Sequence, residues 1–437
     1  MRPNLANAQP DAVPRGLAYP DAVPGSASDR TLLVVSHRPL DAGGGGSIRW
    51  RHLRRVLPSY GWHVVECSPP AGATAREMST DPRAARLASQ RARVMAVAGR
   101  FVDPFARLLR VKPEAFAPNN LWALTGRRLV REAIASEQPA VVVATSPPVS
   151  ALFATAGVAG NAPVVADLRD LWAGNPYYDR GGRLLGSLEG RALARAEAVV
   201  TVTEGCRDEL LRLHPELAPR LHVLPNGFEP SLLARRAEPR PARTGPAKVI
   251  YAGALYGDRT AETLVAALAR PSLRGRTRLE LIGVADPRTL RAIAATSIDA
   301  TVEPPISWES SIERVLAADI AVVISTPGTG GDMALPTKLT EALALGRPVL
   351  ALAGRDSDTA RLLERLGQDA GLASPHDPVA IAAALERLLT APPPPPPPEA
   401  LADFDSDRMA ARYATLLDGL ATRSSNATSS GTTASRR

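Results

Sequence analysis

The sequence predicts an α/β protein made of two tandem, doubly wound parallel-sheet domains that face each other across a cleft. Short β-branched apolar runs alternate with helical patterns along most of the 437 residues, which is typical of parallel sheets covered by helices. The alternation occurs in two series, separated by a Pro- and Arg-rich stretch near residues 227–247. A hydrophobic content of 45% provides enough apolar material for two cores.

The first series predicts an N-terminal domain over residues 31–226, preceded by a disordered leader at 1–30 that is rich in Pro, Ala and Asp. Its strands are continuous apolar runs, as buried parallel strands are. These strands are expected at residues 31–36, 63–67, 140–145, 163–167, 198–202 and 221–224. Helices are expected at residues 48–57, 72–115, 149–159, 182–195 and 205–213.

The second series predicts a C-terminal domain over residues 248–390, joined to the first by a linker at 227–247. Its strands are expected at residues 248–252, 278–282, 301–302, 320–324 and 348–352. Its helices are expected at residues 260–269, 287–295, 308–317, 337–345, 357–366 and 378–389.

The end of the chain combines a stiff segment with an amphipathic helix. Consecutive prolines predict a polyproline II spacer over residues 391–400. Apolar residues recur at helical spacing from Met409 to Leu420, so residues 401–421 are expected to contain a helix with one apolar face. The polar residues 422–437 are expected to form a disordered tail.

Charge and cysteine content restrict the class of partner. The net charge is +8, which suits an anionic substrate or an anionic membrane surface. The sequence has no zinc-finger spacing and no basic strip interleaved with aromatics, so no nucleic-acid partner is expected. It has no signal-peptide pattern, no apolar run of about 18 residues, and only two cysteines. We therefore expect a cytoplasmic protein.

Residues 83–111 mix Arg with Leu, Val and Phe. A basic and apolar surface of this kind would dock on an anionic membrane, which predicts peripheral contact with its inner face. The alternative is an ordinary pair of packed helices.

The Gly-rich loop before the first helix is a candidate anion site. Gly45 and Gly46 allow the backbone to approach a ligand, and a helix N-terminus favours a diphosphate. Arg49, in the first turn of that helix, would add a charge-assisted contact. The spacing matches neither common phosphate-loop motif, so a flexible surface loop is the alternative.

A second candidate site follows the strand at 163–167, in the segment Asp-Leu-Arg-Asp-Leu-Trp. Ligands of doubly wound sheets bind beyond the carboxyl ends of the strands. Arg169 and Asp170 are therefore expected to line the cleft, as catalytic residues that bind or orient the acceptor or the sugar. A structural ion pair between them is the alternative.

Residues 330–349 are the most informative segment. Pro336 suits the first position of a helix. Thr337 and Lys338 at this N-terminus predict an anion site, and Lys338 is one of only three lysines in the chain. Glu341, one turn further on, could accept two hydrogen bonds from ribose hydroxyls. A capped amphipathic helix with a solvated Lys/Glu pair is the alternative.

Taken in order, these segments resemble the GT-B glycosyltransferases of family 4, in the branch with an RDLW segment. The matching stretches span residues 31–420 and include VVSHRPLDAGGGGSIRW, ATSPP, PVVADLRDLW, VVTVTEGC, VLPNGFEP, VIYAGALYGDR and PTKLTEALALGRPVLAL. The resemblance implies two Rossmann-like domains, with the acceptor on the first and the donor on the second. It also implies a last helix that crosses back onto the first domain.

The same resemblance implies transfer of a sugar from a nucleotide sugar, usually with retention at the anomeric carbon and without a bound metal. No cofactor is expected beyond this donor substrate, and no Asp-x-Asp metal signature is recognised. Glu341 matches the second glutamate of the family's E-x7-E motif, a ribose ligand, whereas Met333 replaces the first.

The resemblance also assigns the diphosphate site. Gly253 belongs to the family's Gly-x-Leu segment, in which Ala254 stands where Arg is common. Arg259 lies close to the usual lysine position, so Arg259 and Lys338 are assigned to the diphosphate. Arg169 falls where many relatives carry a histidine near the reacting sugar.

The sequence thus predicts a hexosyltransferase-type enzyme with a glycan, lipid-linked or small-molecule acceptor, as in polysaccharide biosynthesis. One alternative is a non-catalytic GT-B-like partner protein, which the Met333 replacement favours. Another is a nucleotide-sugar epimerase, whose catalytic carboxylates and histidine the sequence does not reveal. The donor base, the donor sugar and the acceptor do not follow from the sequence.

Overall fold

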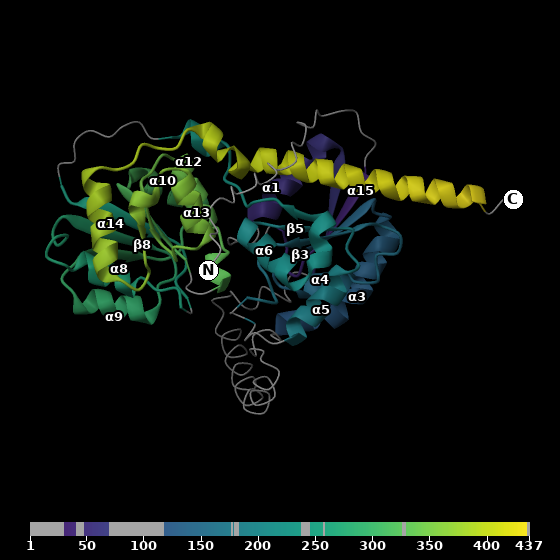
Figure 1. The fold of residues 1–437 in the computed structure, drawn as a ribbon, viewed down its shortest axis with the longest axis horizontal. Coiled ribbons are helices and arrows are strands. Elements are labelled where there is room, and N and C mark those ends of the chain that lie inside the picture. Colours follow the sequence, from purple (N-terminus) through teal and green to yellow (C-terminus); the bar gives the residue numbers. More distant parts are fainter. Residues whose placement is uncertain are drawn as a thin grey trace, which may run out of the picture.

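The computed structural model describes residues 30–40, 48–69, 118–175, 178, 183–236, 245–256, 258–325 and 329–434. Residues 1–29 of the predicted leader, the Gly-rich loop and the predicted helical segment at 72–115 lie outside this part of the chain. The described residues form two α/β lobes, and a long helix extends from one lobe across the other (Figure 1). The predicted fold class is confirmed.

The first domain is built on a parallel sheet with strand order β2-β1-β3-β4-β5-β6 among the described residues. The chain starts in the sheet at β1 and adds β2 on one side of it. It then adds β3 and the later strands on the other side, so the switch point lies between β1 and β3. All six strands coincide with predicted apolar runs. They are β1 Arg30–Val35, β2 Trp62–Cys67, β3 Val141–Ser146, β4 Val164–Leu168, β5 Ala198–Thr201 and β6 Leu221–Val223.

Helices cover both faces of this sheet, and strand alternation explains how. In β1, Leu33 and Val35 pack into the core on one face, whereas Leu32 and Val34 pack into the core on the other. A strand buried on both sides therefore reads as a continuous apolar run. The helical segments are α1 Ile48–Val56, η1 Leu57–Tyr60, α3 Pro118–Glu137, α4 Ser150–Thr155, α5 Arg183–Leu193, α6 Glu204–Leu213 and η4 Pro215–Arg220.

The second domain has the strand order β12-β11-β10-β7-β8-β9, again with parallel pairing. The chain runs outward from β7 to β9, returns, and runs outward from β10 to β12, so the switch point lies between β7 and β10. The strands are β7 Ala247–Ala252, β8 Thr277–Ile282, β9 Asp299–Glu303, β10 Ile320–Ile324, β11 Val349–Leu352 and β12 Leu372–Ala373. The two-residue strand β12 was not predicted, because it is too short for a periodic pattern.

The helices of the second domain flank its sheet on both faces, over two separate buried clusters. They agree with the predicted helices except for the single turn α11 and the short helix η5, neither of which was predicted. The elements are α8 Glu262–Leu268, α9 Pro287–Ala295, α10 Trp308–Ala317, α11 Thr329–Asp332, α12 Thr337–Ala344, α13 Asp358–Arg365, η5 Asp369–Gly371 and α14 Pro378–Thr390.

Two segments cross between the domains side by side. The first contains Phe228 and leads into α7 Ser231–Ala234; the second contains η6 Pro398–Phe404. Phe228 N–H donates to the carbonyl of Phe404, and Ser406 N–H donates to the carbonyl of Phe228, at 2.8 and 3.1 Å. The two crossings are therefore held together by backbone hydrogen bonds.

The last helix, α15 Ser406–Ala434, lies against the first domain, as Figure 1 shows in yellow. Its buried residues, among them Met409, Tyr413 and Leu417, share a core with Leu32 and Val34 of β1. The prediction that this helix ends near residue 421 and is followed by a disordered tail is wrong, because the helix continues to Ala434. Extending an existing helix needs only one more backbone hydrogen bond per residue and no apolar face.

No helix within the described residues is long and apolar enough to cross a membrane.

Candidate functional site

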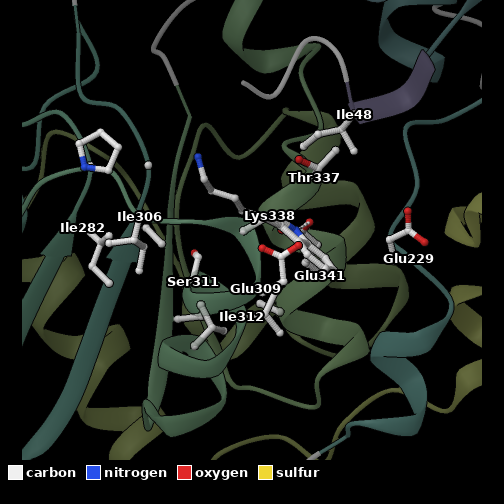
Figure 2. Close-up of a pocket in the computed structure, with 18 of the residues that line it drawn as sticks. Ile48, Glu229, Ile282, Ile306, Glu309, Ser311, Ile312, Thr337, Lys338 and Glu341 are labelled. Carbon is white, nitrogen blue, oxygen red and sulfur yellow. Dashed lines mark hydrogen bonds between the residues drawn. The ribbon is translucent and has the colours of Figure 1, made fainter. Parts of the chain in front are cut away.

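A cavity of about 640 Å³ opens at the carboxyl ends of β7 and β8, next to the switch point of the second sheet. The N-terminal turns of α10 and α12 form much of its wall in the second domain. In Figure 2, Ile282 and Ile306 lie on one side of it, opposite Lys338 and Glu341. Helix α1 and the crossing segment close it from the first domain. The cavity thus lies where doubly wound sheets bind ligands.

Gly253 and Lys338 are in direct contact in this wall. A Cβ added at Gly253 would collide with Lys338 Nζ, so a larger residue here would require the lysine side chain to shift. The ammonium lies 5.8 Å from the centre of the Tyr251 ring. Among the described residues, this side chain has no hydrogen-bond or ion-pair partner. Its donors therefore remain available to a ligand.

The electrostatic environment of Lys338 is that of an anion site. Burial lowers the pKa of its ammonium below the ordinary value of 10.5, and the positive charge of Arg259 lowers this pKa further, whereas Glu341 raises it. The guanidinium carbon of Arg259 lies 5.2 Å from the centre of the Tyr256 ring, three residues earlier in the chain. An anion placed here would relieve the repulsion between the two cations.

Glu341 lies one helical turn after Lys338, and its carboxylate is half-buried in the cavity wall. Its Oε1 accepts a hydrogen bond of 2.9 Å from the indole Nε1 of Trp308, on α10. Burial raises the pKa of the Glu341 carboxyl above its ordinary value of 4.5, while the Trp308 hydrogen bond and the charge of Lys338 lower it. Thr337, Lys338 and Glu341 all line the cavity, as predicted from the helix pattern.

Arg49 does not reach this cavity. Its guanidinium is buried beneath α15, where it donates to the carbonyls of Leu224 and Pro225 at 2.8 and 3.1 Å. It also pairs with the buried carboxylate of Asp167 at 3.4 Å. The prediction that Arg49 contacts a diphosphate is not supported by this position. Gly45 and Gly46 lie outside the described residues.

The charged residues at the end of β4 and directly after it are divided between the core and the cleft. Asp167 is fully buried and accepts hydrogen bonds from Trp50 Nε1 and Thr145 Oγ1, at 2.7 and 3.1 Å. Arg169 is partly buried and donates to the carbonyl of Pro147 at 3.1 Å. Asp167 therefore serves the fold, and only the two residues after β4 remain candidates for the chemistry.

Asp170 follows Arg169 and is exposed to solvent. Desolvation by the surrounding protein raises the pKa of the Asp170 carboxyl above 3.8, while Arg169 and, from the second domain, Arg259 lower it. Asp170 and Arg259 are thus close enough to interact across the cleft. Charge interactions thus relate Asp170 to Arg169 and Arg259, and Arg259 to Lys338. The roles assigned to these residues stay predictions.

Several cavity residues were missed by the sequence analysis. Arg51 and His52 line the cavity from α1, two and three residues after the predicted Arg49. His52 lies between the first crossing segment and the start of α15, with Nδ1 at 3.1 Å from Glu229 and Nε2 at 3.0 Å from Asp407. Only the rotation of α1 about its axis, which packing decides, could have distinguished Arg51 from Arg49.

Within the described part of the chain, no three His, Cys, Asp or Glu side chains are grouped so that they could hold a metal ion.

Each of the two domains matches the model of a known protein family. The family model described as Glycosyltransferase Family 4 matches residues 43–232, and the model described as Glycosyl transferases group 1 matches residues 246–391. The two matches follow one another in the order of the two domains and together span most of the chain. The chain belongs to the group 1 glycosyltransferases of the GT-B fold. The resemblance seen in the sequence is confirmed.

Solved structures support the same fold. A glycosyltransferase from Rickettsia africae ESF-5 aligns with a TM-score of 0.59 and 13% identity, over 90% of this chain and 99% of its own. The lipopolysaccharide outer core galactosyltransferase WaaB aligns with a TM-score of 0.55 and 12% identity, over 88% and 99%. Anabaena Alr3699/HepE, solved in complex with UDP-glucose, aligns with a TM-score of 0.51 and 14% identity, over 92% and 100%. At these identities the likeness concerns the fold. Curated protein sequences give no significant match.

In this glycosyltransferase, the residue at the first E-x7-E position has a structural role. The backbone carbonyl of Met333 accepts a hydrogen bond of 2.8 Å from Thr203 Oγ1 of the first domain. The Met333 side chain packs against the core of that domain. The position that carries a carboxylate in the family's motif is therefore part of the contact between the domains here.

Proposed function

We propose that this glycosyltransferase moves a hexose from a nucleoside-diphosphate sugar to an acceptor, and that the nucleotide binds in the cavity beside α12. The observation that carries the proposal is the pairing of Lys338 and Glu341 on one face of α12. A cation at the helix N-terminus and a carboxylate one turn later match the diphosphate and the ribose of one nucleotide.

The diphosphate would lie against Lys338 and Arg259, with Gly253 giving it close access to the backbone. Departure of the nucleoside diphosphate places negative charge on its oxygens, and stabilising that charge is the main task of the site. Two cations and the N-terminus of α12 are suited to it, and we propose that this chemistry needs no bound metal. Arg51, which lines the cavity from α1, replaces Arg49 as the first-domain residue assigned to the donor.

Arg169 and Asp170 would act at the reacting end of the donor. They follow the carboxyl end of β4 in the first sheet and face the second domain, where the acceptor and the donor sugar would meet. We assign them to orienting the sugar or the acceptor hydroxyl, with transfer that retains the anomeric configuration. The structure of HepE in complex with UDP-glucose favours a sugar nucleotide as the donor. The name of WaaB, a lipopolysaccharide outer core galactosyltransferase, favours a glycan or lipid-linked acceptor.

Met333 favours a second candidate function, that of a non-catalytic partner protein with the same fold. Its side chain contributes no charge to the sugar site and instead packs between the domains. This candidate predicts nucleotide binding without turnover, so it is separated from the first by a transfer assay.

The test is a thermal-shift measurement with UDP-, GDP- and dTDP-sugars, with and without EDTA, on the wild type and on Glu341→Ala. A ligand at about 100 times its Kd adds about 2.7 kcal/mol to the free energy of unfolding, which raises Tm by several degrees. We expect one base to stabilise the wild type regardless of EDTA, and the effect to be lost in Glu341→Ala. Absence of a shift with every nucleotide sugar would contradict the donor assignment.

A further inference from the structure

Trp308 is held in place by its own helix. It is the first residue of α10, whose N-cap Ser307 accepts a hydrogen bond from Ser310 N–H and fixes the helix start. Its ring packs against the buried cluster that also contains Ile312, four residues later on the same helix face. The indole is therefore anchored on the second domain independently of any ligand.

The indole N–H reaches from α10 to α12, where it donates to Glu341 Oε1 at 2.9 Å. An indole is a donor only, so this group cannot itself accept a hydrogen bond from a sugar hydroxyl. A carboxylate offers about four lone-pair directions, of which Trp308 occupies one. Within the part of the chain that the structure describes, Oε2 and the second lone pair of Oε1 have no donor. These are enough for two neighbouring hydroxyl groups.

We propose that Trp308 is a positioning residue for the donor site: its indole N–H holds Glu341 in the rotamer that accepts both hydroxyls of the ribose. This inference rests on the proposed function, because it concerns the same nucleotide pocket. A free glutamate side chain samples many rotamers and would lose that freedom on binding. The Trp308 hydrogen bond fixes the carboxylate beforehand, so its contribution is specific to ligands that carry the ribose diol.

The test compares nucleotides with and without the diol. Isothermal titration gives the Kd of UDP and GDP, which carry the ribose diol, and of their 2′,3′-dideoxy analogues for the wild type, Trp308→Phe, Glu341→Gln and the double variant. We expect the wild type to prefer the hydroxylated form. Trp308→Phe should reduce this preference by about tenfold, in keeping with one hydrogen bond to a charged acceptor. In the Glu341→Gln background, Trp308→Phe should leave the remaining preference unchanged.

Trp62→Phe is the matched control. Trp62 Nε1 donates to a carboxylate in the same way, to Asp418 Oδ1 at 2.9 Å, but in the first domain. This variant should lower Tm without changing the preference for the diol. An equal loss of affinity for both nucleotide forms in Trp308→Phe would overturn the proposal, because it would show that the ring only stacks on the base. An unchanged preference would overturn it too.

Two further results separate this inference from the proposed function. If the wild type binds a nucleoside diphosphate but does not distinguish it from its dideoxy analogue, the role of Trp308 is refuted while the donor pocket stands. If no nucleotide binds, both are refuted. Should Trp308→Phe fail to fold, the indole ¹H–¹⁵N resonance of Trp308 in the wild type answers the question. It should shift more with the hydroxylated nucleotide than with the dideoxy form, and equal shifts would refute the proposal.

Discussion

The hydroxyl of Thr203 joins the two domains by donating a 2.8 Å hydrogen bond to the carbonyl of Met333. The same oxygen accepts a hydrogen bond of 3.1 Å from Cys206 N–H, as the N-cap of α6. Gly205 N–H, in the first turn of α6, donates to Asp358 Oδ2 of the second domain at 3.1 Å. The start of α6 thus contacts the second domain at two places.

Replacing this hydroxyl should weaken both the cap and the domain contact. We expect Thr203→Ala to lower the free energy of unfolding by about 2 kcal/mol, because two hydrogen bonds are lost together. Thr203→Ser keeps the hydroxyl and should recover most of the loss. Urea denaturation measures the change, and Asp377→Ala, which removes only the cap of α14, is the control. Equal losses in Thr203→Ala and Thr203→Ser would assign the effect to the methyl group instead.

Gly253→Ala should impair the donor site more than the fold. The added Cβ meets Lys338 Nζ, which must leave its present position, and we expect nucleotide affinity to fall by at least about tenfold. Gly245→Ala, just before β7, is the control, since a Cβ there meets nothing within 4 Å. Titration with the nucleotide that stabilises the wild type measures both. Unchanged affinity in Gly253→Ala would remove Lys338 from the diphosphate site.

The lowered pKa of Lys338 predicts that nucleotide affinity falls at alkaline pH. Burial and Arg259 lower its pKa, so a bound diphosphate, which favours the charged form, binds less well as pH rises through this lowered pKa. Lys338→Arg keeps its charge and should bind at higher pH, whereas Lys338→Met should bind weakly at every pH. Titrations between neutral pH and pH 10.5 test this. Parallel profiles for the wild type and Lys338→Arg would contradict it.

The lowered pKa of Lys338 also affects the stability of the protein without ligand, which should increase as pH rises. Because folding lowers the pKa of Lys338, the folded state holds fewer protons than the unfolded state between the lowered value and 10.5. Its contribution to the free energy of unfolding therefore rises as pH rises through this window, and the cost of the buried charge is fully present below it. Lys338→Met should remove this rise, which urea denaturation across the same pH range would detect.

Arg49 is expected to serve stability. Arg49→Met would leave the buried carboxylate of Asp167 without its ion-pair partner, and such a loss costs about 3–5 kcal/mol. Because the guanidinium does not reach the cavity, nucleotide affinity of the folded variant should stay unchanged. Denaturation and titration measure the two effects. A large loss of affinity with little loss of stability would restore Arg49 as a donor ligand.

Much of the candidate site could be predicted because it lies on one short helix. Glu341 follows Thr337 by four residues and Lys338 by three, so helical geometry alone places it on the same face as both. The capping proline and the apolar pattern mark the helix start in the sequence. Contacts between distant segments could not be predicted in this way. Trp308 and Glu341 are 33 residues apart, and only packing of α10 beside α12 brings them within hydrogen-bond distance.

The sequence by itself determined the two series and every described strand except the two-residue β12, because a parallel strand buried on both faces must be a continuous apolar run. It also determined the residues of the α12 face, because a helix repeats every 3.6 residues. The tertiary structure decided which way α1 turns. Burial of Trp50 and Leu53 against the sheet directs Arg49 into the core and leaves Arg51 at the cavity. Local periodicity fixes the angles between neighbouring side chains, but the direction in which a helix presents them depends on the surface against which it packs.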